Sequence, residues 1–143
     1  AEAGEIDLPL GSDWADRPRQ KVDFAAGKPS LTRYRVLRYE KSVRAEPVEA
    51  RTGSSHSPFD KLRANGLPEL PAGATRVELE PVTGRTHQLR VHMAAMGCPI
   101  LGDVLYGGPA GGSADRLMLH ASVLSFAHPF SGELIRFECA PPF

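Results

Sequence analysis

One stretch of helical spacing stands in a chain whose other ordered stretches alternate like strands, and this contrast most constrains the fold. In RTHQLRVHMAAMG, residues 85–97, apolar side chains recur at helical spacing and should face the core: Leu89, Met93 and Met96. Thr86 is a plausible N-cap, and Gly97 is placed to end the helix. We therefore predict one helix from about 87 to 96.

Strand-like alternation occurs on both sides of that helix. Apolar and polar residues alternate, or β-formers cluster, in the following segments: 4–10, 30–40, 75–81, 116–127 and 133–138. We expect these segments to form one sheet with the helix packed on it. The pattern predicts an α+β fold, an antiparallel or mixed sheet with one main packed helix.

A long irregular stretch interrupts this pattern between residues 44 and 71. It shows no sustained period and carries four prolines together with Gly, Ser and Asn. Such a length is unusual inside a compact domain. We predict an inserted surface loop that can be deleted without loss of the fold. An RNA-binding use of its basic residues is the alternative, which acidic residues in the same stretch make less favourable.

Composition excludes several classes of protein. Seventeen Lys and Arg balance 17 Asp and Glu, which disfavours indiscriminate polyanion binding but leaves room for a local basic face. No apolar run of about 18 residues exists. The start, AEAGEIDL, lacks the features of a signal peptide, so we expect a cytoplasmic protein. Cys98 and Cys139 are far apart and are predicted to be buried thiols.

General motifs for metal binding or nucleophilic catalysis are missing. The histidines lack the spacing of a zinc site on one helical face: His87, His92, His120 and His128. No serine lies in a G-x-S-x-G elbow. The favoured interpretation of each histidine is a hydrogen-bonded structural role.

Arg90 raises a question of charge. Helical spacing makes the side chain of Arg90 project from the buried half of the domain. An unpaired guanidinium there would raise the free energy of the folded state. On periodicity alone, the favoured interpretation is a structural ion pair inside the chain. Its candidate partners are Glu78, Glu80 and Asp103.

Longer motifs are more specific. LEPVTGRTHQLRVHMAAMGCPILGDVLYGG, followed by RLMLHASVLSFAHPFSGE, resembles the C-terminal half of the catalytic domain of the RluA family of RNA pseudouridine synthases. DLPLGSDWADRPRQKVDFAAGKPSLTRYRVL resembles the RluA subgroup, whose members modify uridines in large-subunit ribosomal RNA and in the anticodon stem-loop of transfer RNA. The resemblance implies that 1–143 is the C-terminal part of such a domain. It also implies an RNA substrate, no metal or organic cofactor, and a monomer when complete.

The resemblance further implies roles for individual residues. In this family an aspartate attacks the target nucleoside, and the last arginine of the RTHQLR motif, Arg90 here, pairs with it. Arg85, Thr86, His87 and Gln88 would lie near the catalytic cleft. Leu119 would pack beside the target base, although an ordinary core role is a serious alternative.

The family places the aspartate in an H-R-L-D motif, which occurs nowhere in these 143 residues. The expected result is a fragment or a truncated product, with a catalytically inactive RNA-binding remnant as the alternative function. Three structural expectations follow. Arg90 should either face an open cleft or borrow a local carboxylate, and it should lack a buried bidentate partner. An edge strand should be unpaired, and apolar surface should be exposed.

Overall fold

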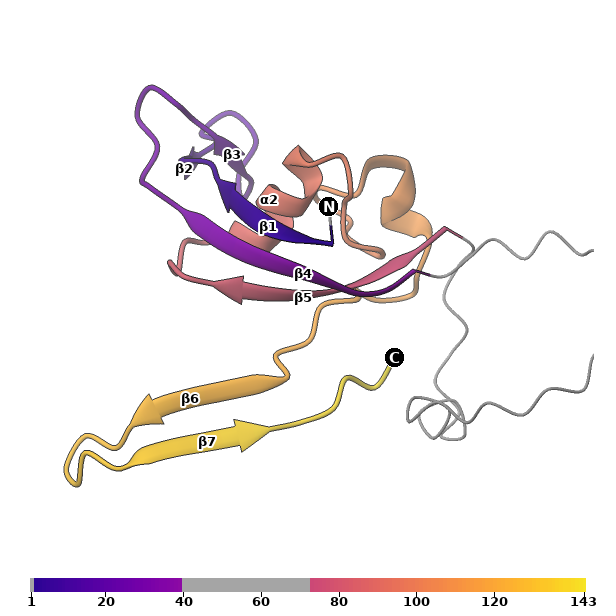
Figure 1. Ribbon diagram of the computed structural model, residues 1–143. Coiled ribbons are helices and arrows are strands. Elements are labelled where there is room, and N and C mark those ends of the chain that lie inside the picture. The colour runs from indigo at the N-terminus through magenta and orange to yellow at the C-terminus, as the bar shows by residue number, and fades with distance from the viewer. Residues whose placement is uncertain (1, 40–72) are drawn as a thin grey trace, which may run out of the picture. The chain divides into compact units, whose positions relative to one another are not determined.

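The computed structural model describes residues 2–39 and 73–143 (Figure 1). These residues belong to two compact units. In the described part, the first unit spans 2–39 and 73–118, and the second spans 119–143. The predicted loop at 44–71 lies outside the described residues.

A three-stranded antiparallel sheet organises the first unit. Its strands, in the spatial order β1-β4-β5, are β1 (Ala3–Asp7), β4 (Leu31–Tyr39) and β5 (Thr75–Pro81). Ile6 of β1 lies opposite Thr32 of β4, and Tyr34 of β4 lies opposite Leu79 of β5. The predicted segments 4–10, 30–40 and 75–81 are therefore confirmed as neighbours in one sheet over the residues of β1, β4 and β5.

A second, smaller sheet joins β2 (Leu10–Ser12) to β3 (Gln20–Val22). The prediction missed this division, because segment 4–10 was taken as one strand and a polar, turn-rich stretch follows it. Strands of three residues are too short to show a period. The backbone of Leu10 also exchanges hydrogen bonds with that of Lys28, which ties the pair of strands to the next segment.

In the part of the chain that the structure describes, the α-helix α2 spans Gln88–Ala95 and lies against the sheet (Figure 1). Its N-cap is His87 in the left-handed conformation, φ 55°, with no side-chain cap, so the predicted Thr86 cap is wrong. The helix ends as predicted, because Gly97 takes φ 74° just after it. A short 3-10 helix, η1 (Gly108–Gly112), follows farther along the chain.

The face that α2 buries differs from the predicted apolar face. The helix buries Gln88, Val91 and His92, whereas Met96 remains 51% exposed. The reason is hydrogen bonding: the ring of His92 lies 2.9 Å from Oγ1 of Thr32 through Nδ1 and 3.0 Å from the carbonyl oxygen of Leu8 through Nε2. The helix therefore docks through a polar contact that apolar periodicity does not report.

Polar groups make up much of the interior. The buried apolar side chains are Ile6, Leu10 and Val91. The buried polar ones are Ser30, Thr32, Gln88, His92 and Asp103. Among the described residues, every buried side-chain nitrogen or oxygen has a hydrogen-bond partner. Hydrogen bonds therefore compensate for the burial of these polar groups.

The described part of the second unit contains a β-hairpin. β6 (Val123–Ala127) pairs antiparallel with β7 (Leu134–Glu138), and Phe126 stacks on Phe137 with ring centroids 6.2 Å apart. These strands form their own two-stranded sheet, so the prediction of one common sheet is wrong here. Alternation identifies a strand but does not identify the strand that pairs with it.

The hairpin exposes large apolar side chains, as expected. The exposed apolar residues of the hairpin are Val123, Leu124, Phe126, Phe130, Leu134 and Phe137. Cys98 and Cys139 are also exposed, so the prediction of buried thiols is wrong. Within the described residues, no helix is long and apolar enough to cross a membrane.

Candidate functional site

Arg90 and Asp103 form a two-pronged ion pair in the first unit. Nε of Arg90 donates to Oδ2 of Asp103 at 2.9 Å, and Nη2 donates to Oδ1 at 2.7 Å. The side chain of Asp103 is 0% exposed and that of Arg90 is 16% exposed. The expectation that Arg90 lacks a buried bidentate partner is therefore wrong. The partner is one of the three carboxylates that periodicity alone proposed.

The backbone around Asp103 completes its set of partners. The N–H groups of Leu105 and Tyr106 each donate to Oδ1 at 3.0 Å. Burial raises the pKa of Asp103, but the hydrogen bonds from Arg90, Tyr106 and Leu105 outweigh this effect, and the pKa falls below its ordinary value. The hydrogen bonds to Asp103 raise the pKa of Arg90. The pair is therefore ionised at neutral pH.

One edge of the Arg90 guanidinium is free. Within the described part of the chain, Nη1 makes no hydrogen bond, whereas every buried side-chain nitrogen there has a hydrogen-bond partner. Nη1 must therefore reach solvent. The site thus presents a rigidly held cation with one open, two-hydrogen edge, which is suited to an incoming carboxylate or phosphate.

His87 joins the same cluster through Tyr106. The Tyr106 hydroxyl lies 2.7 Å from Nδ1 of His87 and accepts the backbone N–H of Gln20 at 2.8 Å. Burial and then the nearby charge of Arg90 lower the pKa of His87, against the opposing effect of Asp103. A neutral ring that accepts from Tyr106 at Nδ1 carries its own hydrogen on Nε2.

The left-handed backbone of His87 is an unusual feature of this cluster. Residues other than glycine seldom take φ 55°, although His does so more readily than most. Such strain persists only where the surroundings impose it, and it often marks a functional site.

Gln88 is engaged on every side. Its Nε2 donates to the carbonyl oxygen of Leu31 at 2.9 Å and to Oγ1 of Thr32 at 3.0 Å. Its Oε1 accepts from the hydroxyl of Thr83 at 2.7 Å and from the N–H of Arg85 at 3.0 Å. The amide therefore joins the start of α2 to β4 and has no group left for a ligand.

The remaining predicted site residues differ in accessibility. Arg85 and Thr86 are exposed at the start of α2, and Nε of Arg85 donates to the carbonyl oxygen of Pro29 at 3.2 Å. Leu119 is half-buried and belongs to the second unit. The structure thus brings His87, Gln88 and Arg90 together on one short segment.

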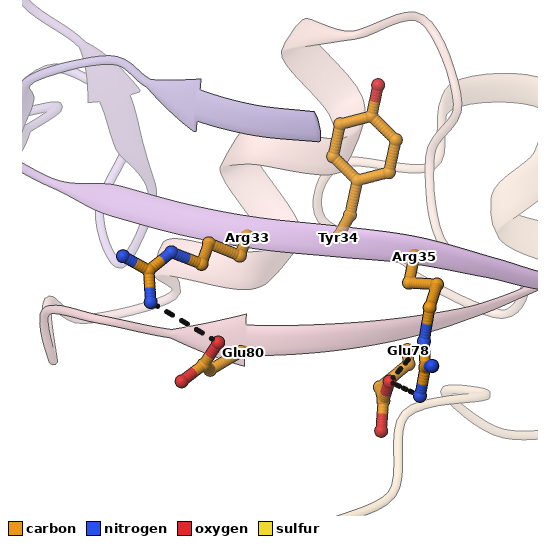
Figure 2. Close-up of a pocket in the computed structure, with 5 residues that line it drawn as sticks. All are labelled: Arg33, Tyr34, Arg35, Glu78 and Glu80. Atoms are coloured by element: carbon orange, nitrogen blue, oxygen red, sulfur yellow. Dashed lines mark hydrogen bonds and ion pairs between the residues drawn. The ribbon is translucent and has the colours of Figure 1, made fainter. Parts of the chain in front are cut away.

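A hollow of about 180 Å³ lies elsewhere in the first unit, over β4 and β5 (Figure 2). It is lined by Arg33, Tyr34, Arg35, Glu78 and Glu80. Figure 2 shows each arginine turned toward a glutamate of the neighbouring strand. Because these charges already neutralise one another, the hollow is a poor site for a phosphate.

Sequence reasoning named Asp103 only as one possible partner and did not use Tyr106. A signal was present in the motif G-x-P-I-x-G-D-x-x-Y-G, which contains both residues. In the described ranges, no group of three or more His, Cys, Asp or Glu side chains could hold a metal ion.

Comparison with known proteins agrees with the resemblance. A sequence profile described as RNA pseudouridylate synthase matches residues 1–95. A protein of Pasteurella multocida named dual-specificity RNA pseudouridine synthase RluA is 42% identical over 144 residues, which is 99% of this chain and 52% of that protein. The Escherichia coli K12 protein of the same name is 40% identical over 98% of this chain and 51% of its own length.

A solved structure of human RNA pseudouridylate synthase domain containing 1 is also similar. It matches with a TM-score of 0.69 and 28% identity, and the match covers 100% of this chain and 50% of the human one. The α+β fold is thereby confirmed. The chain spans about half the length of the curated relatives it matches. On the profile match and these identities, the chain belongs to the RNA pseudouridylate synthase family.

Proposed function

We propose that this chain forms the arginine-bearing part of an enzyme that isomerises uridine to pseudouridine in RNA. The observation that carries the proposal is the guanidinium of Arg90, which Asp103 binds on one edge while Nη1 reaches solvent. A carboxylate that docks on Nη1 would stay ionised at neutral pH and keep one orientation, as a nucleophile requires.

The nucleophile comes from outside these 143 residues, which contain no H-R-L-D motif. That aspartate attacks the target nucleoside, the glycosidic bond breaks, and the freed uracil is turned and rejoined to the sugar through C5. The reaction conserves every atom and needs no metal or organic cofactor. This chain supplies the cation that keeps the aspartate charged.

The substrate is a uridine of large-subunit ribosomal RNA, of a transfer RNA anticodon stem-loop, or of both. The resemblance to the RluA subgroup supports this choice, and the names of the bacterial relatives support two specificities without naming the RNA. Exposed Arg85 and Thr86 contact the RNA, and His87 contributes its Nε2–H. Gln88 acts indirectly by fixing the start of α2, and Leu119 packs beside the target base. The complete enzyme works as a monomer in the cytoplasm.

The test joins this chain to the part of the Escherichia coli relative that lies outside the match. Pseudouridine in ribosomal and transfer RNA is then mapped chemically. We expect modification by the fusion and a loss of a few orders of magnitude in Arg90→Met, since an unpaired charge costs about 3–5 kcal/mol. Arg35→Met removes an exposed arginine of β4 in the same unit and should react normally. Equal activity of Arg90→Met and the unsubstituted fusion would refute the proposal.

An RNA-binding protein without catalysis is the second candidate, and the missing H-R-L-D motif favours it. The same fusion separates the two functions, because it contains the relative's unmatched part. RNA binding without pseudouridine formation would support the second candidate.

A further inference from the structure

The turn from Gly102 to Gly107 has a construction that ordinary packing does not require. Gly102 takes φ 71°, and a Cβ there would lie 1.8 Å from the carbonyl oxygen of Arg116. A Cβ on Gly107 would lie 2.4 Å from the carbonyl oxygen of Asp103, which accepts the N–H of Gly107 at 2.7 Å. Only glycine therefore fits at either end of this turn.

Within that turn, one carboxylate organises three groups. Asp103 accepts the N–H groups of Leu105 and Tyr106 and both prongs of Arg90. The same turn places the ring of Tyr106 with its centroid 5.0 Å from Cζ of Arg90, within the range of a cation–π contact. The Tyr106 hydroxyl is fixed in turn by Gln20 and His87.

We propose that Asp103 is a positioning residue for the reaction: it occupies the Nε edge of Arg90 so that Nη1 faces the catalytic carboxylate. This inference rests on the proposed function. Asp103 holds Nε and Nη2 of the largely buried Arg90, whereas Nη1 makes no hydrogen bond in the described part and is left for a carboxylate from outside it. A buried ion pair is also an inefficient source of stability, since apolar replacements often stabilise a fold more.

The motif G-D-x-x-Y-G therefore has one physical purpose in this chain. Gly102 and Gly107 permit the tight turn, Asp103 orients the guanidinium, and Tyr106 covers it and connects it to His87. A displacement of the guanidinium by about 1 Å is enough to cost on the order of 100-fold in rate. Asp103 and Tyr106, which together form a clamp on Arg90, prevent such a displacement.

The first measurement needs no activity and uses the chain as it is. In ¹⁵N-labelled protein, hydrogen exchange of arginine Nε–H groups is followed by NMR. Nε–H of Arg90 should exchange about tenfold or more slowly than that of Arg35, whose Nε–H binds an exposed glutamate at nearly the same distance. Asp103→Asn should remove the protection of Arg90, and Glu78→Gln should affect only Arg35. Equal exchange of both arginines in the unsubstituted chain would overturn the clamp.

The second measurement uses the fusion with the Escherichia coli relative. Asp103→Asn should slow single-turnover pseudouridine formation on the order of 10–100-fold, with RNA affinity changed less than about twofold. Arg90→Met combined with Asp103→Asn should react no more slowly than Arg90→Met alone, because Asp103 acts through Arg90. Glu78→Gln is the matched control and should react normally.

Two results would overturn the positioning role. One is a normal reaction rate in Asp103→Asn. The other is a rate of Asp103→Asn that returns to that of the unsubstituted fusion when the temperature is lowered until circular dichroism shows the same fold for both proteins. If Asp103→Asn does not fold, the exchange comparison of Arg90 with Arg35 decides. If the unsubstituted fusion makes no pseudouridine, the proposed function fails, while the exchange measurement still tests the clamp.

Discussion

Two arginine–carboxylate pairs in the first unit use the same arginine atoms at similar distances in very different surroundings, although Arg90 binds both oxygens of Asp103 and Arg35 binds only Oε2 of Glu78. Arg90 approaches Asp103 through Nε and Nη2 at 2.9 and 2.7 Å, and Arg35 approaches Glu78 through the same atoms at 3.0 and 2.6 Å. The first pair is 16% and 0% exposed, and the second is 65% and 53% exposed. Distance alone therefore does not distinguish them; burial does.

Burial changes what each pair does for the fold. Water screens the exposed pair, so its contribution is at most about 1 kcal/mol. In the buried pair, loss of either partner leaves a charge that water cannot fully solvate. A buried pair is therefore a poor source of net stability but strongly restricts where its members can lie. Such restriction suits a group that must meet a reactant in one orientation.

The largest expected effect is the loss of the buried cation. Arg90→Met leaves the fully buried Asp103 charged and unpaired, so the free energy of unfolding should fall by about 3–5 kcal/mol. Urea denaturation of the 143-residue chain measures this change. Arg35→Met is the control and should change stability by less than about 1 kcal/mol. Similar losses in the two variants would show that burial does not separate the pairs.

A smaller effect should appear on acidification. The pKa of Asp103 is lowered in the fold, so its stabilising effect is complete above its unfolded pKa of about 3.9 and is lost as the pH falls through the folded value. Protonation of Asp103 should lower the free energy of unfolding less than Arg90→Met does, because the charge that remains, on Arg90, reaches solvent through Nη1.

Urea denaturation from pH 7 to pH 3 measures that effect. The stability difference between the unsubstituted chain and Asp103→Asn should shrink below about pH 4. His87, whose pKa is also lowered, loses its contribution as the pH falls below about 6.5. Because Asp103 opposes that lowering, this loss is larger in Asp103→Asn and widens the difference before Asp103 itself is protonated. A difference that is constant across this range would contradict an ionised Asp103.

The polar contact between α2 and β4 should give the next effect. Thr32→Val keeps the shape of the side chain but removes the partner of Gln88 Nε2 and His92 Nδ1, at a cost of about 1–3 kcal/mol. Thermal and urea unfolding measure it. Thr75→Val, at an exposed position of β5, is the matched control. An unchanged stability in Thr32→Val would mean that water replaces the lost hydroxyl.

The smallest effect should come from the exposed pair. Glu78→Gln should lower the free energy of unfolding by less than about 1 kcal/mol, and 1 M NaCl should remove most of the difference. Parallel titrations at low and high salt measure this. Asp103→Asn should retain its larger deficit at high salt, because the buried pair is poorly screened. Equal salt sensitivity of the two variants would remove the distinction between the pairs.

Local patterns predicted the local features of the fold. Alternation located β4 and β5, and Gly97 marked the end of α2. A glycine with positive φ and a period of two both reflect preferences of a few neighbouring residues, so a single sequence is enough to recognise them. The family followed from long ordered motifs around Arg90.

The contacts of the site required the tertiary structure. Residues 60 positions apart, Thr32 and His92, decide which face of α2 is buried, and a turn 13 positions away decides which of three carboxylates binds Arg90. Period and composition do not encode such pairings, because hydrogen bonds between distant segments depend on how the segments fold together. The sequence by itself determined the types of element, the end of the helix and the family. Only the tertiary structure decided the polar interior, the separate β6–β7 hairpin and the clamp on Arg90, because each of these is a choice of partner rather than a local preference.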